Sequence, residues 1–174
     1  MKISTKQIAL VGILSAITVA LAVTGLGFIP VPNVSGGMTI MHIPTIIAGA
    51  LGGPIVGGFT GLIFGAASFY YYGAVVGYNF VVIFIPRILI GIFSALVFKL
   101  FYKKNIYVAG AMAGFVGTIT NTLGVIGLIL LFNIFPISAM IPILTVNFPI
   151  ELIVGTIISG LSLPVLYRAI KKEA

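Results

Sequence analysis

The chain has 174 residues, of which 60% are hydrophobic and 6% are charged, and its net charge is +7. A soluble domain carries about a quarter charged residues, so this composition excludes a water-soluble globular protein. Because the apolar residues come in runs of about 18 or more, the length that crosses a hydrocarbon core of about 30 Å, we expect one all-α integral membrane domain over residues 1–174.

Six transmembrane helices are expected along the chain. The first is retained as a helix and not cleaved as a signal peptide, because its apolar run lacks a small-residue cleavage site. Gly52-Gly53-Pro54 marks a tight turn between a short second span and the third. The apolar stretch 133–146 holds two prolines and is interpreted as a loop that dips into the membrane or covers a site. The spans are expected at about residues 6–28, 38–51, 54–71, 78–102, 106–132 and 147–168.

The positions of the basic residues predict how the six-helix bundle is oriented in the membrane. All but one of them fall on the same side of a six-span arrangement, and the loops after spans one, three and five contain none. Because positive residues near span ends mark the cytoplasmic side, both termini are expected in the cytoplasm. The net charge is therefore a topology signal, and no nucleic-acid partner is expected. The residues on that side are Lys2, Lys6, Lys99, Lys103, Lys104, Arg168, Lys171 and Lys172.

Arg87 is the one basic residue away from the cytoplasmic ends. It lies about nine residues into the fourth span, hence about 13 Å below its outer end. An arginine at that depth costs at least about 2.5 kcal/mol unless it faces the bundle interior, a partner or water. Arg87 is therefore expected to contact an anionic or polar ligand, or to form a structural pair with Glu151, the only acidic residue inside a span. Both hold if Glu151 orients Arg87.

Other polar residues within the spans are candidates for ligand binding, each with a structural alternative. His42, early in the second span, contacts a ligand or makes a helix-end hydrogen bond. Asn121, in the fifth span, binds a ligand or joins helices by hydrogen bonding. Asn147 and Asn79, at the outer starts of spans six and four, bind a ligand or cap their helices. One histidine and no cysteine exclude a multi-histidine or thiolate metal site, and no cofactor is expected.

Aromatic residues gather around the end of span three and the start of span four. Most fit an interfacial aromatic belt, and a few, with Phe64 and Tyr78 as candidates, stack on a bound ring or cover a pocket. Glycines recur every four residues in the third and fifth spans and predict close helix packing. Ala16 and Ala20 form a similar small-residue face on the first span, which either packs internally or docks another membrane protein.

The sequence contains no catalytic motif. It has no Walker motif, nucleophile elbow, HExxH or paired carboxylates, so neither an enzyme nor an ATPase is expected. If the chain pumps a solute, a partner must supply the energy.

Three features resemble a known family, the substrate-binding S components of energy-coupling factor (ECF) vitamin transporters. They are the stretch Met-His-Ile-Pro-Thr-Ile-Ile-Ala-Gly-Ala-Leu-Gly-Gly-Pro-Ile-Val-Gly-Gly, the Pro-Arg-Ile-Leu-Ile-Gly segment of span four, and the Ala-xxx-Ala pair of span one. The resemblance covers essentially the whole chain. It implies a multi-pass protein of the bacterial plasma membrane that binds a vitamin in an outward-facing pocket. It also implies association with a transmembrane T subunit, docked on Ala16 and Ala20, and with two cytosolic ATPases.

The resemblance leans toward the group that includes pantothenate transporters. In that picture Arg87 pairs with the vitamin carboxylate in a charge-assisted contact, while Asn121 and Asn147 hydrogen-bond its amide and hydroxyls. Pyridoxine and hydroxymethylpyrimidine are the competing ligands. The remaining residues of the expected binding site are His42, Glu151, Phe64 and Tyr78.

The main rival interpretation is a stand-alone six-helix secondary transporter or channel. Such proteins often show inverted repeats or intramembrane carboxylates for proton coupling, and here only Glu151 could serve. A vitamin that co-purifies with the solitary chain favours the S component. Proton-coupled uptake by the chain alone favours the rival.

Overall fold

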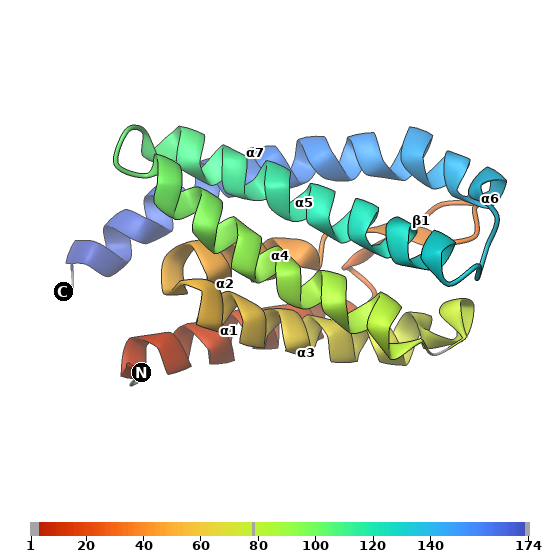
Figure 1. The fold of residues 1–174 in the computed structure, drawn as a ribbon. Helices are drawn as coiled ribbons and strands as arrows, with labels where there is room; N and C mark the ends of the chain where they lie inside the picture. The colour runs from red at the N-terminus through yellow and green to blue at the C-terminus, as the bar shows by residue number, and fades with distance from the viewer. Residues whose placement is uncertain (1–3, 78, 173–174) are drawn as a thin grey trace.

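The computed structural model describes residues 4–77 and 79–172 and is helical throughout, apart from one small hairpin (Figure 1). The all-α class expected from composition is confirmed. The elements are α1 (Thr5–Val23), β1 (Phe28–Pro30), β2 (Gly37–Thr39), α2 (His42–Gly52), α3 (Pro54–Tyr72), η1 (Gly73–Val76), α4 (Phe80–Phe101), α5 (Ile106–Leu131), α6 (Ile137–Pro142), η2 (Ile143–Asn147) and α7 (Phe148–Lys172).

Five helices in the described part of the chain are long and apolar enough to cross a membrane. The second predicted span, 38–51, differs from the structure, which has strand β2 at its start and an 11-residue helix after it. At 1.5 Å per residue α2 is about 16 Å long, roughly half of a hydrocarbon core. Its first eight residues are all buried, as befits a short helix in the centre of a bundle.

The termini lie at the same end of the bundle, together with the α4–α5 connection, while the hairpin and α6 lie at the other end (Figure 1). We call these the terminal end and the hairpin end. Helix α2 begins near mid-height, because His42 contacts Thr118 at the midpoint of α5. It finishes at the terminal end, where the Gln7 side chain donates a 3.0 Å hydrogen bond to the carbonyl of Gly52. The hairpin half of the bundle therefore has no α2 in its centre.

Glycine rows set the distances between the long helices. A Cβ added to Gly57 would lie 2.5 Å from the carbonyl oxygen of Gly91 on α4, and one added to Gly65 would lie 2.8 Å from the Phe84 ring. On α5, a Cβ added to Gly110 would lie 2.8 Å from the carbonyl oxygen of Ser159 on α7. The close packing predicted from the four-residue glycine spacing is thus confirmed for α3 with α4 and for α5 with α7.

A short antiparallel hairpin replaces the first irregular loop. Phe28 pairs with Thr39 and Pro30 with Gly37. The first predicted span, 6–28, ends earlier than expected because Gly25 adopts a φ of 72°, the left-handed conformation that commonly terminates helices. This turn sends the chain into β1.

The stretch 133–146, interpreted as a loop, is mostly helical. After a short connection it forms α6 from Ile137 and continues through the π-helical segment η2 into α7. Pro142 and Pro149 each remove a backbone donor, and the helix adapts between them by widening its turns. The amide of Phe148 accordingly bonds to the carbonyl of Ile143, five residues back. The sixth predicted span, 147–168, is therefore extended by ten residues on its N-terminal side.

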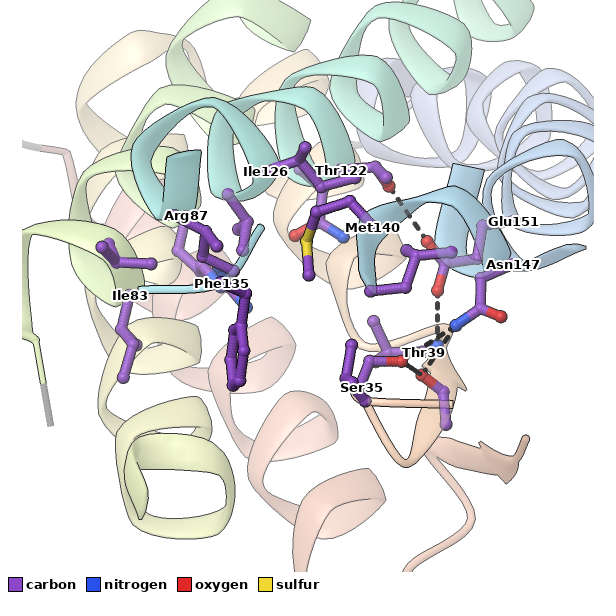
Figure 2. Close-up of a pocket in the computed structure, with 17 residues that line it drawn as sticks. Ser35, Thr39, Ile83, Arg87, Thr122, Ile126, Phe135, Met140, Asn147 and Glu151 are labelled. Atoms are coloured by element: carbon purple, nitrogen blue, oxygen red, sulfur yellow. Dashed lines mark hydrogen bonds between the residues drawn. The ribbon is translucent and has the colours of Figure 1, made fainter. Parts of the chain in front are cut away.

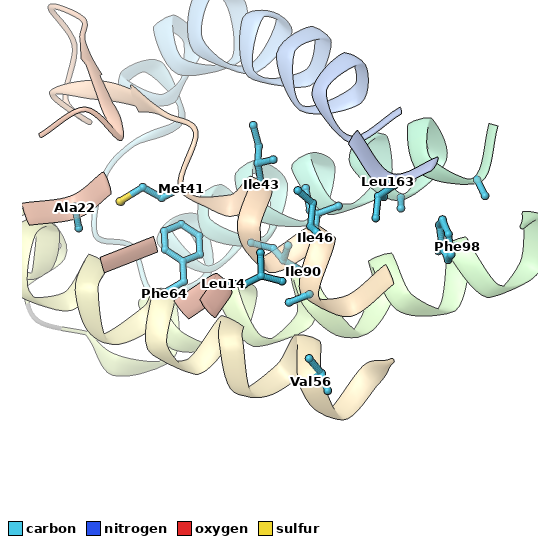
Figure 3. Packing of buried hydrophobic residues seen from close by; sticks show 14 residues of the cluster. Leu14, Ala22, Met41, Ile43, Ile46, Val56, Phe64, Ile90, Phe98 and Leu163 are labelled. Carbon is cyan, nitrogen blue, oxygen red and sulfur yellow. The ribbon is translucent and has the colours of Figure 1, made fainter. Parts of the chain in front are cut away.

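In the part of the chain that the structure describes, the buried apolar residues form two clusters. The larger surrounds α2 and includes Ile46, Phe64, Ile90 and Leu163 (Figure 3). The smaller lies among α4, α5, α6 and η2 and includes Met140, which is fully buried. The smaller cluster borders the cavity described below.

Adjacent glycines of α3 provide a test of this packing. Gly57→Ala should lower the melting temperature in detergent, because its methyl group would meet the Gly91 backbone and overpacking costs about 1–3 kcal/mol. Gly58→Ala is the matched control, since its Cβ would meet only isoleucine side chains at 3.8–3.9 Å. It should keep or raise the melting temperature, because alanine favours helices. Equal melting temperatures for the two variants would contradict the α3–α4 geometry.

Candidate functional site

A cavity that is partly open to solvent lies in the hairpin half of the bundle (Figure 2). It is walled by the hairpin, α4, α5 and the continuous α6–η2–α7 segment. Most of its surface is apolar, with side chains such as Ile83, Ile126 and Phe135. The side chains among its lining that can form hydrogen bonds are Ser35, Thr39, Arg87, Asn121, Thr122, Asn147 and Glu151.

Glu151, in the first turn of α7, fixes one side of the cavity. Its Oε1 accepts a 2.8 Å hydrogen bond from the backbone N–H of Thr39, and its Oε2 accepts one of 3.2 Å from the Thr122 hydroxyl. The carboxylate therefore joins β2 to α5 from its position on α7. A carboxyl group that is only 7% exposed requires such partners, because burying a polar group without hydrogen bonds is costly.

Asn147 attaches the hairpin to the π-helical segment. Its Oδ1 accepts a 2.9 Å bond from the Asn33 side chain, and its Nδ2 donates to the Ser35 hydroxyl at 3.0 Å and to the Gly37 carbonyl at 3.2 Å. It does not cap a helix, since η2 continues into α7 without a break. Asn79, by contrast, caps α4 by accepting from the amide of Val82. We call the Asn147 and Glu151 contacts to residues 33–39 the hairpin latch.

Arg87 lies on α4, across the cavity from the hairpin latch (Figure 2). Its guanidinium carbon sits over the Phe64 ring, 5.5 Å from the ring centre. Asn121 also lines the cavity and is 5% exposed, and its Oδ1 has no hydrogen-bond partner among the described residues. The cavity thus presents a cation on one wall, hydrogen-bonding oxygens and amides on others, and apolar side chains between them.

The structure brings together four of the residues expected at the site, namely Arg87, Asn121, Asn147 and Glu151. His42 is fully buried below the cavity, where its Nε2 lies 3.1 Å from the Thr118 hydroxyl. Phe64 is also fully buried and lies behind Arg87, outside the lining. Tyr78 lies outside the described residues.

Several lining residues were not expected from the sequence. Thr122 belongs to a polar run in span five that stands out within an apolar helix, so a signal existed for it. Ser35 lies in the predicted loop after the first span and Thr39 near the start of the predicted second span, and the hairpin brings both to the cavity. Met140 and Phe135 belong to the stretch interpreted as a loop.

Two comparisons with known proteins both find similarity to membrane transport proteins. A family model described as "ECF transporter, substrate-specific component" matches residues 6–167. Over 114 residues the chain is 32% identical to a protein of Lactococcus lactis subsp. cremoris (strain MG1363) named pantothenic acid transporter PanT. That match spans 54% of this chain and 57% of the relative, so it covers little more than half of either protein.

The hairpin latch is tested by replacing one asparagine. Asn147→Asp keeps the size of the side chain but removes both donated hydrogen bonds and buries a charge beside the Gly37 carbonyl. Amide hydrogens of residues 31–37 should then exchange with deuterium about tenfold faster, because the hairpin opens more often. Hydrogen–deuterium exchange with mass spectrometry measures the effect.

Asn79→Asp is the matched control for this experiment. An N-cap needs only an acceptor for the Val82 amide, which aspartate also supplies, so hairpin exchange should stay unchanged. If Asn147→Asp also leaves residues 31–37 as protected as in the wild type, Asn147 does not hold the hairpin.

Proposed function

Because the chain belongs to the family of ECF transporter substrate-specific components, we propose that it captures pantothenate for import across the cell membrane. The observation that carries the proposal is the cavity in which Arg87 faces the hairpin latch across an apolar space (Figure 2). Such a site suits a small molecule with a carboxylate at one end and hydroxyl or amide groups along its length.

The membrane arrangement that we propose has six crossings and cytoplasmic termini. The basic residues at the helix ends lie in or beside segments of the terminal end, which agrees with the rule that positive residues mark the cytoplasmic side. They are Lys6, Lys99, Lys103, Lys104 and Arg168. Five long helices alone would leave the two termini at opposite ends, whereas α2 returns the chain and places both at one end. The cavity, in the hairpin half, then faces outside.

The chemistry of pantothenate matches the lining of the cavity. Its carboxylate would pair with Arg87, the cation on the cavity wall, in a charge-assisted contact. Its amide would form a hydrogen bond with the side chain of Asn121, which lines the cavity. Pyridoxine and hydroxymethylpyrimidine carry no carboxylate and would leave Arg87 without an anionic partner from the ligand. The name of the Lactococcus relative, which matches over part of its length, agrees with the acidic vitamin.

Arg87→Ala provides the test of substrate and site. Isothermal titration calorimetry of the purified chain should show pantothenate affinity falling by about 100-fold, because a charge-assisted contact with the carboxylate is lost. Arg168→Ala is the matched control, since Arg168 also lies over an aromatic ring, that of Tyr107 at 5.6 Å, but at the terminal end. It should bind pantothenate as the wild type does.

Two outcomes would contradict the proposal in different ways. Unchanged pantothenate affinity in Arg87→Ala would show that the carboxylate lies elsewhere. A wild-type chain that binds pyridoxine or hydroxymethylpyrimidine in preference to pantothenate, or that co-purifies with either in mass spectra, would keep the family role and reject the substrate.

The proposed function also requires partners that hydrolyse ATP. We propose that α1 docks on a transmembrane T subunit, which in turn binds two cytosolic ATPases. The supporting feature is a row of small residues, Gly12, Ala16 and Ala20, that is exposed on the outer face of α1. A Cβ added to Gly12 would meet nothing within 4 Å, so this face is open and does not pack inside the bundle. Small residues of this kind let helices approach closely in lipid.

Tryptophan substitutions on α1 test the docking face. Ala16→Trp or Ala20→Trp should abolish pantothenate uptake by cells that co-express the T subunit and ATPases, because the bulky ring prevents close approach. Pantothenate binding by the isolated chain should stay within about twofold of wild type, since both positions are exposed and neither lines the cavity. Ala66→Trp, at an exposed alanine of α3, is the control and should keep uptake. Uptake that survives in all three variants would place the docking face elsewhere.

A further inference from the structure

Phe64 lies behind Arg87 as seen from the cavity. The ring is fully buried and does not line the cavity, whereas Arg87 does. The guanidinium carbon is 5.5 Å from the ring centre, within the range of a cation–π contact. Arg87 is therefore placed between an aromatic face on α3 and the space where a ligand would lie.

The backbone packing of α3 on α4 fixes the height at which the two side chains meet. Gly61, one turn before Phe64, lies against the carbonyl of Arg87, and no Cβ would fit between them. Gly65, the residue after Phe64, lies against the Phe84 ring, one turn nearer the N-terminus of α4. Because helical side chains lean toward the N-terminus of their helix, the Arg87 side chain reaches to the level of Phe64.

The other side of α4 is held at the same height. Pro86 is buried, and a Cβ added to Gly124 of α5 would lie 3.1 Å from its ring. The segment of α4 that carries Arg87 thus packs closely against both α3 and α5, which leaves little room for it to shift along or away from either helix. Arg87 is therefore held in place at two points, its backbone by the packing of α3 and α5 against α4, and its guanidinium by the Phe64 ring.

We propose that Phe64 and Gly61 are positioning residues for Arg87, and that they determine the preference of the site for an anionic over a neutral ligand. This inference rests on the proposed function and extends it to residues behind the cavity wall. The Phe64 ring stabilises the guanidinium in a region shielded from water and turns it toward the cavity. Gly61 keeps α4 close enough to α3 for that contact to form.

A purely structural role for Phe64 makes a different prediction. If the ring only fills the core, its loss lowers the affinity for all ligands by a similar factor, because the packing of the whole bundle is weakened. If the ring positions Arg87, its loss selectively lowers the affinity for a ligand that carries a carboxylate. Pantothenate and its alcohol analogue panthenol, in which CH2OH replaces the carboxylate, separate the two roles because they differ only at the group that would meet Arg87.

The experiment compares Phe64→Leu, Phe64→Tyr and the matched control Phe98→Leu by calorimetry with both ligands. Phe98 belongs to the same buried cluster but stacks on Tyr102 near the terminal end. Phe64→Leu should lower pantothenate affinity by about tenfold and panthenol affinity by less than about twofold, as expected for loss of a shielded cation–π contact. Phe64→Tyr, which keeps the ring face, and Phe98→Leu should both preserve the ratio of the two affinities.

A second readout needs no ligand. In proton–nitrogen NMR spectra, the Nε–Hε resonance of Arg87, identified by its absence in Arg87→Lys, should move in Phe64→Leu because the ring current is lost, and should stay in place in Phe98→Leu. A resonance that does not move overturns the placement of Arg87 on Phe64. A resonance that moves while the affinity ratio stays constant overturns the role in ligand preference.

The two proposals fail in distinguishable ways. A wild-type chain that binds neither pantothenate nor panthenol rejects the proposed substrate, and the arginine resonance then supports or overturns the positioning by Phe64 on its own. Pantothenate binding that depends on Arg87 but is indifferent to Phe64→Leu keeps the substrate and rejects the positioning role.

Discussion

The hydrocarbon core of a bilayer offers no hydrogen bonds, so the backbone amides and carbonyls buried in this bundle need partners inside the protein. This constraint explains how a hairpin can lie against the helices of a membrane protein. The Thr39 amide is satisfied by Glu151, and the Gly37 carbonyl by Asn147. Irregular backbone is tolerated at such a place because it is buried in protein or lines a cavity. The latch residues are therefore required by the fold, whatever ligand the cavity holds.

The cavity exists because α2 is short. In the terminal half, α2 fills the centre of the bundle, and the glycines of α3 and α4 bring the helices into backbone contact around it. In the hairpin half that central position has no helix, and the space is bordered instead by the hairpin, α4, α5 and the α6–η2–α7 segment. The π-helical turns of η2 belong to the same adaptation, since they carry Asn147 to the hairpin. Tight packing in one half of the bundle thus supports an open site in the other.

Residues that violate the apolar pattern were the ones that the sequence could locate. Arg87, Asn121 and Glu151 stand out in apolar runs, and all three line the cavity because a membrane helix can place such groups only toward the interior. The hairpin could not be predicted, since its three-residue strands are too short for a periodic signal, and its contact with Glu151 joins residues more than a hundred positions apart. Helix α6 was missed because proline suggested a loop, although proline is compatible with a first helical turn and with widened turns. Phe64 was expected to touch a ligand, and its contact with Arg87 depends on the α3–α4 register, which no local pattern shows.

The polar residues that line the cavity differ in whether their hydrogen-bonding groups are already used within the protein. The Nδ2 group of Asn147 already donates to two hairpin acceptors, and each oxygen of Glu151 already accepts one hydrogen bond. Asn121 differs, because its buried Oδ1 has no partner among the described residues. A ligand that pairs with Arg87 and hydrogen-bonds the Asn121 side chain would therefore leave the hairpin latch intact. The apolar part of such a ligand would lie against side chains such as Phe135 and Ile83, on the cavity surface between Arg87 and the hairpin latch.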